Sequence, residues 1–310
     1  MNMMNETAVK VENLTVKFDS FVAVNGISFQ VQKGEIFGFL GANGAGKTTT
    51  IRVLCGLLQP DDGKVCVAGI ALDESTNKIK QKVGYMSQKF TLYQDLTVEE
   101  NLDFISSLRQ VDPKQYLKRR SDILAFIHFS KPLNSLVKDL PGGIKQQVAL
   151  AASVLHDPEI VFLDEPTAGL SPLSRSRFWD LIKKLSKEKT IFVTTHYMDE
   201  VENCDRIALM REGEIIAIDS PAGLKKLAFK SQMYEVTTED HETIGVDEFK
   251  DNEGISYHEI YGHSHHIVFA TTEAGVKAQS VLEQSHTLIP IAPTLEDVFI
   301  ELIESKAERK

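Results

Sequence analysis

Cysteine is scarce in this sequence, and long apolar runs are missing. The three cysteines, Cys55, Cys66 and Cys204, are odd in number and form no Cys-x-x-Cys pair, which excludes a disulfide framework or a thiolate metal site and favours a reducing compartment. The apolar stretches at 160–163 and 215–218 are far shorter than the roughly 18 residues that a bilayer-spanning helix needs. The chain is therefore not expected to cross a membrane by itself.

A surplus of basic charge is also absent. The 310 residues include 34 Lys and Arg against 44 Asp and Glu, and the excess of acid lies in residues 231–310, which hold 16 acidic and five basic side chains. Because binding to nucleic acid or anionic lipid requires a basic surface, no nucleic-acid partner is expected. Residues 1–7 lack the basic and apolar regions of a secretory signal, so secretion is not expected either.

The composition that remains is that of a globular protein. With 310 residues, 42% of them hydrophobic and 25% charged, the chain suits one large domain and a small one, or two medium domains. Continuous apolar runs at 160–163 and 191–193 flank a helical stretch at 177–187, and this alternation predicts a mainly parallel α/β sheet covered on both faces. The other expected elements are strands at 8–14, 28–31 and 35–40, turns at Asp19-Ser20 and Asn25-Gly26, a helix at 47–58, and mostly helices at 90–154, opened by a Thr97 and Glu100 capping box.

A change of composition near residue 230 predicts a domain boundary. The pattern breaks at 219–223, a basic helical stretch follows at 224–230, and the rest is acidic. We therefore expect a large α/β domain over 1–230 and a small α+β domain over 231–310. The elements predicted in the second domain are strands at 233–237, 256–261, 266–270 and 288–292 and helices at 246–250, 273–283 and 295–305.

The strongest local signal is a glycine-rich loop between the strand at 35–40 and the helix at 47–58. Residues 41–48 match the P-loop pattern Gly-x-x-x-x-Gly-Lys-Thr in its strand-loop-helix context. Glycines let backbone N–H groups converge on a polyphosphate, the lysine neutralises its oxygens and the threonine hydroxyl reaches Mg²⁺. A loop without a ligand is the disfavoured alternative. The predicted nucleotide-binding residues are Gly41, Asn43, Gly44, Ala45, Gly46, Lys47, Thr48 and Thr49.

An acidic pair, Asp164 and Glu165, follows the apolar run at 160–163. A carboxylate at the carboxyl end of a strand can hold the magnesium shell, and a second one beside it can polarise an attacking water. Alone, such a pair is usually a helix cap. In a chain with a P-loop, we expect Asp164 to serve the metal and Glu165 to serve catalysis.

In their order along the chain these motifs closely resemble those of the nucleotide-binding subunit of ABC transporters, over residues 8–225. Residues 84–88 resemble the Q-loop, 140–147 the signature motif, 160–165 the Walker B strand, 168–171 the D-loop and 195–196 the switch-histidine loop. The resemblance implies a P-loop NTPase fold with a RecA-like parallel sheet, an N-terminal antiparallel β subdomain and a helical subdomain at 90–154.

The resemblance also implies roles for single residues. Gln88 would contact magnesium and the attacking water, His196 would orient the γ-phosphate, and Phe18 would stack on adenine. Gly142 and Gly143 would bind the nucleotide of a second subunit in a dimer that closes around ATP. Read alone, Gln88 would be a surface residue, His196 a structural histidine and Phe18 a core aromatic.

Three positions depart from the family pattern. Pro141 stands where a serine hydroxyl usually contacts the γ-phosphate, Gln147 where arginine is frequent, and Ser171 where the D-loop usually has aspartate. A hydrogen bond to a charged group is worth roughly 1.5–3 kcal/mol. Without that hydroxyl, Pro141 would weaken ATP binding between two subunits by about ten- to a hundredfold. Similar signatures occur in one branch of drug-exporter ATPases.

Residues 35–40, 85–90 and 293–299 resemble ATPases of ABC-2, daunorubicin-resistance-like multidrug exporters. This resemblance implies a subunit that binds ATP and Mg²⁺, hydrolyses ATP and energises a separate integral membrane permease, near residues 90–96, from the cytoplasmic face of the cell membrane. It would work as a homodimer or heterodimer. The alternatives are a non-transport ABC ATPase, an ATP-binding regulator with weak hydrolysis and, within the family, an importer ATPase.

Four histidines in the acidic region, His258, His263, His265 and His266, suggest a metal site. No matching cysteines or His-x-x-x-His helix accompany them, so we favour a structural role. The expected helix at 295–303 is amphipathic; packing within its own domain is the default, and a dimer contact is the alternative.

Overall fold

The structure, a computed structural model, describes residues 6–88, 92–237, 249, 252–262, 264–284 and 286–307, with side chains as far as 303. The chain divides into two compact units, Met1–Ile218 and Asp219–Lys310. The division lies before the boundary expected at residue 230. Its cause is helix α8 (Pro221–Ala228), which packs against α10 (Leu295–Ala307) inside the second unit.

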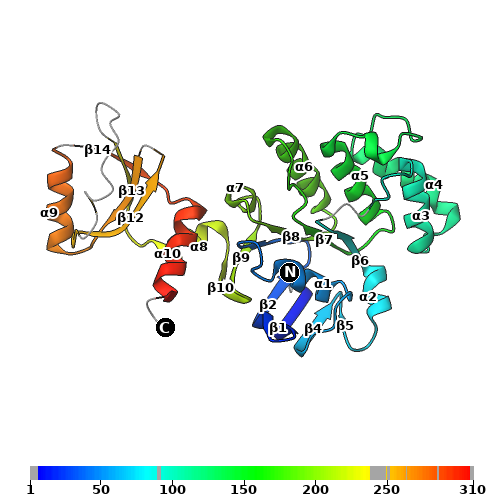
Figure 1. Ribbon diagram of the computed structural model, residues 1–310, viewed down its shortest axis with the longest axis horizontal. Coiled ribbons are helices and arrows are strands. Elements are labelled where there is room, and N and C mark those ends of the chain that lie inside the picture. Colours follow the sequence, from blue (N-terminus) through cyan, green and yellow to red (C-terminus); the bar gives the residue numbers. More distant parts are fainter. Residues whose placement is uncertain are drawn as a thin grey trace, which may run out of the picture. The chain divides into compact units, whose positions relative to one another are not determined.

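The centre of the first unit is a sheet of six strands in the order β10-β9-β3-β8-β7-β6 (Figure 1). Strands β3, β6, β7, β8 and β9 pair in parallel, and every residue of β3, β7 and β8 is buried. The predicted parallel α/β fold is thereby confirmed. The bounds are β3 Ile36–Leu40, β6 Val83–Met86, β7 Ile160–Asp164, β8 Thr190–Thr195, β9 Arg206–Arg211 and β10 Glu214–Asp219.

A second, antiparallel sheet has the order β2-β1-β4-β5, with β1 Thr7–Phe18, β2 Phe21–Gln32, β4 Asp62–Val67 and β5 Ile70–Ala71. The first two strands are longer than predicted because only Asp19-Ser20 forms the hairpin turn, with Asp19 at φ 53°. The predicted turn at Asn25-Gly26 is wrong. The pair forms a bulge inside β2, where the register shifts and the Asn25 N–H donates to the Gly213 carbonyl at 2.8 Å.

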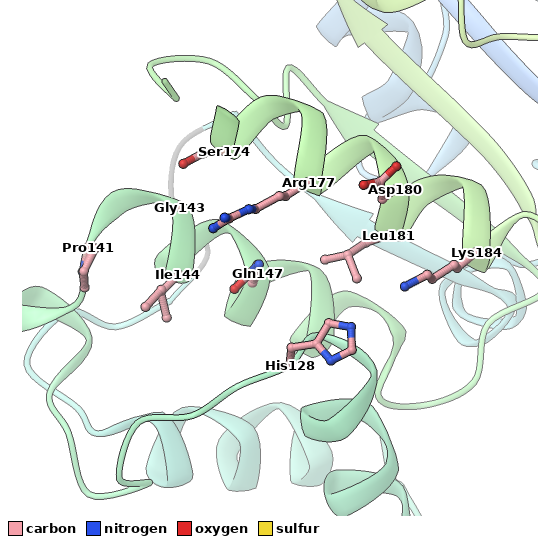
Figure 2. A pocket seen from close by; sticks show the side chains of 10 residues that line it. All are labelled: His128, Pro141, Gly143, Ile144, Gln147, Ser174, Arg177, Asp180, Leu181 and Lys184. Carbon is pink, nitrogen blue, oxygen red and sulfur yellow. The ribbon is translucent and has the colours of Figure 1, made fainter. Parts of the chain in front are cut away.

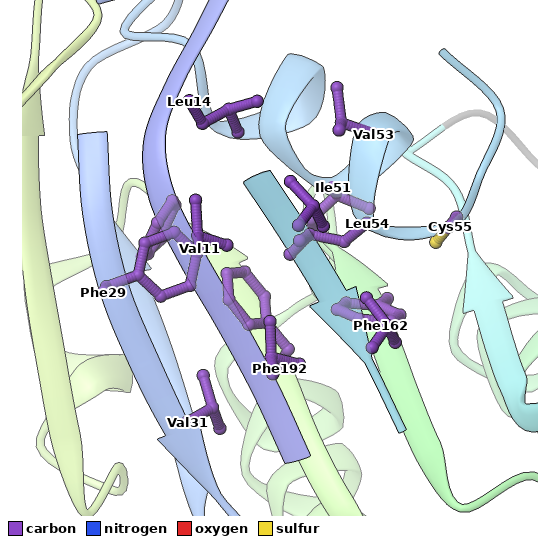
Figure 3. Packing of buried hydrophobic residues seen from close by; sticks show 14 of the residues in the cluster. Val11, Leu14, Phe29, Val31, Ile51, Val53, Leu54, Cys55, Phe162 and Phe192 are labelled. Atoms are coloured by element: carbon purple, nitrogen blue, oxygen red, sulfur yellow. The ribbon is translucent and has the colours of Figure 1, made fainter. Parts of the chain in front are cut away.

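The main core joins the antiparallel strands, the central sheet and α1 (Lys47–Leu54) (Figure 3). The ring of Phe29 on β2 lies 5.1 to 6.1 Å from the rings of Phe37, Phe39 and Phe192 on β3 and β8. Each such pair adds about 0.5–1.5 kcal/mol to the burial of its rings. The cluster therefore holds β3, and with it the glycine-rich loop, in place.

Helices form the rest of the first unit. Helix α3 begins with the predicted capping box, in which Thr97 accepts from the Glu100 N–H and the Glu100 carboxylate accepts from the Thr97 N–H. Helix α6 begins five residues before its predicted start because Ser171 caps it and Pro172 occupies its first position. The bounds are α2 Thr76–Lys82, α3 Val98–Leu108, α4 Pro113–Phe126, α5 Gly142–Val154, α6 Pro172–Leu185 and α7 Met198–Val201.

The second unit is an antiparallel sheet of order β12-β13-β11-β14 with helices α8, α9 and α10. Its elements are β11 Met233–Thr237, β12 Ile255–Tyr261, β13 Ser264–Phe269, α9 Glu273–Leu282 and β14 Thr287–Ile291, each near its predicted place. The helix expected at 246–250 lies outside the described residues except for Phe249. Of the helices that the structure describes, none is long and apolar enough to span a bilayer.

Candidate nucleotide-binding site

The site lies where three neighbouring parallel strands end. The glycine-rich loop follows β3, Glu165 follows β7 and His196 follows β8. Because β8 pairs with both β3 and β7, these three carboxyl ends meet at one edge of the sheet. Ligands of open α/β sheets bind at such an edge.

The glycine-rich loop leads into α1 through backbone that only glycine adopts readily. Gly46 precedes the helix at φ 102° and Gly44 lies at φ 82°. A side chain at Gly41 would begin only 2.2 Å from the Met210 carbonyl oxygen. Of the other predicted loop residues, Asn43 is exposed, Ala45 is buried and Thr49 is half-buried.

Lys47, the first residue of α1, points back into the loop. Its buried ammonium donates to the carbonyls of Gly41 and Ala42 at 2.7 and 3.0 Å, and its Nζ lies 3.5 Å from Glu165 Oε1. Burial lowers the pKa of Lys47, and the charge of Glu165 opposes that shift. The side chain thus presents one cation to the centre of the loop.

Asp164 links the loop to the sheet. Its Oδ1 accepts from the Thr48 hydroxyl at 3.0 Å and from the Thr194 hydroxyl at 2.7 Å. Burial raises the pKa of Asp164, and the two hydrogen bonds oppose the increase. Sequence reasoning missed Thr194. The only signal for it was a pair of threonines, Thr194 and Thr195, between the apolar run at 191–193 and His196.

Glu165 is the centre of the site. Its Oε2 accepts from Gln88 Nε2 at 2.9 Å and lies 3.5 Å from His196 Nδ1. Its backbone is left-handed, with φ 47°, and its N–H donates to both the carbonyl and the hydroxyl oxygen of Thr194 at 3.1 Å. The structure therefore brings together Lys47, Gln88, Glu165 and His196, which are far apart in sequence.

Phe18 is not among these contacts. It ends β1 at the hairpin tip opposite Phe21, and the two side chains are 45% and 61% exposed. The structure thus places Phe18 on the surface rather than in the core. The hairpin lies near the loop, since a side chain at Gly46 would meet the Ala23 carbonyl oxygen at 2.5 Å.

Gly142 and Gly143 are the first residues of α5, where a side chain at Gly142 would meet nothing within 4 Å and one at Gly143 would meet Ser174 of α6 at 3.2 Å. Pro141 is the residue that caps α5, without any side-chain hydrogen bond. Figure 2 shows a groove between α5 and α6, with Arg177 and Lys184 pointing from α6 toward α5. The groove has a volume of about 520 Å³. Its lining residues are His128, Pro141, Gly143, Ile144, Gln147, Ser174, Arg177, Asp180, Leu181 and Lys184.

The histidines of the second unit make pairs. His258 Nε2 lies 2.6 Å from His265 Nδ1, and His266 Nδ1 lies 3.0 Å from Asp297 Oδ1. Within the part of the chain that the structure describes, no three or more His, Cys, Asp or Glu side chains are grouped to hold a metal ion. His263 lies outside the described residues.

A P-loop with an adjacent carboxylate pair on a parallel sheet defines a P-loop NTPase. Residues 24–168 match the family described as ABC transporter. The probable multidrug ABC transporter ATP-binding protein YbhF of Escherichia coli is 43% identical over 235 residues, which are 76% of this chain and 41% of YbhF. The chain thus spans about two fifths of the length of this relative.

Two further proteins are similar to this chain over almost their whole length. The Nod factor export ATP-binding protein I of Rhizobium etli is 30% identical over 307 residues, 98% of this chain and 95% of that protein. The dimeric ATP-binding cassette MJ0796, solved in a post-hydrolysis state with ADP and Pi, is 26% identical with a TM-score of 0.63, over 68% of this chain and 98% of that one. This chain therefore belongs to the ATP-binding proteins of ABC transporters.

Proposed function

We propose that this chain hydrolyses ATP to energise a separate membrane permease that exports drugs or other amphiphilic small molecules. The observation that carries the proposal is the meeting of Lys47, Gln88 and His196 around Glu165, beside Asp164. Export is supported by the relatives, since YbhF is a probable multidrug transporter protein and the Rhizobium relative is a Nod factor export protein.

In this proposal the loop from Gly41 to Thr49 binds the phosphates of ATP. Its backbone N–H groups and the N-terminus of α1 attract the polyphosphate. Lys47 exchanges the carbonyls of Gly41 and Ala42 for phosphate oxygens, and Phe18 stacks on the adenine. Asn43, Gly44, Ala45 and Gly46 shape the loop.

Asp164 fits the Mg²⁺ that accompanies ATP. Its Oδ2 is buried and has no hydrogen-bond partner within the described part of the chain, and such an oxygen satisfies a hard cation or one of the waters bound to it. Thr48, Gln88 and Asp164 are the residues that we assign to the ion. When bound, Mg²⁺ neutralises charge on the phosphates, and its own charge opposes the burial that raises the Asp164 pKa.

Glu165 is the general base for an attacking water. Gln88 holds one carboxylate oxygen at 2.9 Å, which fixes the direction of the other toward Lys47. His196 orients the γ-phosphate from the end of β8. A positioned base contributes about 10² to 10⁴-fold to a rate, so Glu165 carries the largest single effect that we assign to one side chain.

We assign the permease contact to exposed side chains that follow Gln88 in the sequence. Tyr93 and Phe104 meet edge to face at 5.1 Å yet stay 55% and 41% exposed, and Leu108 on α3 is 63% exposed. A cluster of exposed apolar side chains marks a contact surface. Of the expected segment 90–96, residues 90 and 91 lie outside the described part. Docking there would hold the chain at the cytoplasmic face of the membrane.

The test is magnesium-dependent ATP hydrolysis by the purified full chain. Glu165→Gln is expected to lower turnover by about a hundredfold or more while ATP binding remains, and Lys47→Ala is expected to weaken binding itself. Glu188→Gln, an exposed change on the same unit, is the control. Turnover of Glu165→Gln equal to that of the unmodified chain would contradict the proposal.

One observation favours a second candidate, an ATP-binding regulator with weak hydrolysis. Pro141 offers neither a hydroxyl nor an N–H at the start of α5, so a second subunit would receive fewer hydrogen bonds from this loop. Tight ATP binding with negligible turnover, both alone and with a permease, would support the regulator.

A further inference from the structure

A buried carboxylate, Glu200 on α7, joins the segment after Glu165 to the segment around His196. Glu200 is only 1% exposed. Its Oε1 accepts from the hydroxyl of Thr167, which lies two residues after Glu165, and its Oε2 accepts from Thr195, the neighbour of His196, at 2.7 Å. The segments that follow β7 and end β8 therefore both donate a hydrogen bond to the same carboxylate.

Arg175 on α6 supplies the positive charge next to this carboxylate. Its Nε lies 3.5 Å from Glu200 Oε1, and Nη1 lies 3.5 Å from Asp199 Oδ2. The Asp199 side chain is 73% exposed, so that ion pair contributes little. The guanidinium thus lies beside the buried Glu200 carboxylate, as an ion pair in which Arg175 Nε makes no hydrogen bond within the described part of the chain.

The guanidinium also covers an aromatic ring. Arg175 Cζ lies 3.9 Å from the centre of the Tyr197 ring, and the Tyr197 ring lies 4.1 Å from the imidazole of His196. A cation over an aromatic face is attracted by about 0.5–2 kcal/mol. The rings of Tyr197 and His196 are tilted by 37°. Arg175, Tyr197 and His196 thus form a row of contacting side chains, here called the stack, that ends in the site.

We propose that Arg175 is a positioning residue for ATP hydrolysis, anchored by Glu200 and acting on His196 through the ring of Tyr197. This inference rests on the proposed function, because it assigns a task to His196. Arg175 touches neither Lys47 nor Glu165 in the described contacts, so its loss leaves the phosphate-binding loop in place. Loss of Arg175 is therefore expected to slow the hydrolysis of bound ATP rather than to weaken ATP binding.

The first experiment measures the position of His196 without turnover. The full chain is prepared with ¹³C-labelled histidine, and the NMR signals of the His196 ring are identified among those of the nine histidines by their loss in His196→Gln. The ring of Tyr197 is expected to displace these signals from the positions of a histidine without an aromatic neighbour. Arg175→Ala and Tyr197→Leu are expected to remove most of that displacement. Tyr197→Phe keeps the ring and Lys183→Ala changes an exposed residue of α6, so both are expected to keep it. An unmoved His196 signal in Arg175→Ala overturns the proposal.

The second experiment measures ATP hydrolysis by the same variants. Arg175→Ala is expected to lower kcat by about tenfold with KM for ATP nearly unchanged, because only the geometry of His196 is altered. Arg175→Lys keeps a charge beside Glu200 but lacks the planar group that covers Tyr197. It is therefore expected to unfold like the unmodified chain in a thermal melt and still lose turnover.

The outcomes separate this proposal from the one on which it rests. Full rescue of turnover by Arg175→Lys would show that Arg175 only neutralises Glu200 and would overturn the positioning role. A chain that hydrolyses no ATP, yet whose His196 signal moves in Arg175→Ala, would contradict the proposed function and leave the stack established. Equal losses of kcat and of folded protein would overturn the positioning role as well.

Discussion

At the scale of the residue, Asp164 shows how the site favours ligand binding over stability. A buried carboxylate with one free oxygen is unfavourable in its charged form, and two hydroxyl donors offset only part of that penalty. The direction of the pKa shift follows from burial. The same oxygen is the one that we assign to Mg²⁺.

The raised pKa of Asp164 gives a prediction for stability against pH. The folded chain retains a proton on Asp164 at pH values where the unfolded chain has lost it. The contribution of protonated Asp164 to the free energy of unfolding is therefore fully present below the ordinary aspartate pKa, and it is lost as the pH rises through the raised pKa of the folded chain.

Asp164→Asn removes this dependence. We expect the variant to unfold at a higher urea concentration than the unmodified chain at neutral pH, with the difference shrinking in acid. Its stabilisation by Mg²⁺ and ATP should be lost. A larger difference in acid than at neutral pH would contradict the assignment.

The parts of the site that are formed by contiguous residues were predicted from the sequence. Gly41 to Thr48 and the pair at 164–165 are contiguous, and their chemistry follows from the loop and strand on which they sit. Thr194 and Arg175 carry no such signal, because a threonine or an arginine acquires its role only from partners far along the chain.

At the scale of the element, the tip of the β1–β2 hairpin presents Phe18 and Phe21 to solvent. If Phe18 stacks on adenine, Phe18→Ala should raise the Kd for ATP by about tenfold, since stacking of a base on an aromatic side chain is worth about 1–3 kcal/mol. Phe21→Ala is the matched control and should leave the Kd unchanged. Isothermal titration would measure both, and equal effects of the two changes would contradict a specific adenine contact.

Helix α5 lacks a capping side chain because Pro141 precedes it. Pro141→Ser supplies an oxygen for the free N–H groups at the helix start, so the free energy of unfolding should rise by about 1 kcal/mol. The same hydroxyl would restore the contact with the γ-phosphate of a second subunit and raise turnover. A more stable chain with unchanged turnover would show that the second subunit does not use this position.

Element positions were predicted well wherever the apolar pattern was continuous, as in β3, β7 and β8. The turn predicted at Asn25-Gly26 was wrong because its residues suit a turn and a bulge equally. The Gly213 carbonyl, almost 190 residues away, selects the bulge, and no local pattern reports a partner at that distance.

At the scale of the whole molecule, Gly142 and Gly143 begin α5 rather than the glycine-rich loop, and under our proposal they would complete the site of a second subunit. In a symmetric dimer each chain would give its signature to the loop of the other. We expect Glu165→Gln to form such a dimer with Mg²⁺ and ATP in analytical ultracentrifugation and to return to monomer when EDTA is added. A monomer under all conditions would contradict a homodimer and favour pairing with a different ATPase.

The sheet order also bears on how this protein folds during synthesis. Strand β3 and its loop are made early, but their neighbours β8 and β9 follow only at 190–211. At the ribosome's pace of about 5–20 residues per second, β3 remains without these neighbours for roughly ten to thirty seconds. The β1–β2 hairpin, whose contacts are local, can form at once. Competence to bind nucleotide therefore arises late in translation, after an interval in which an apolar strand is available to chaperones.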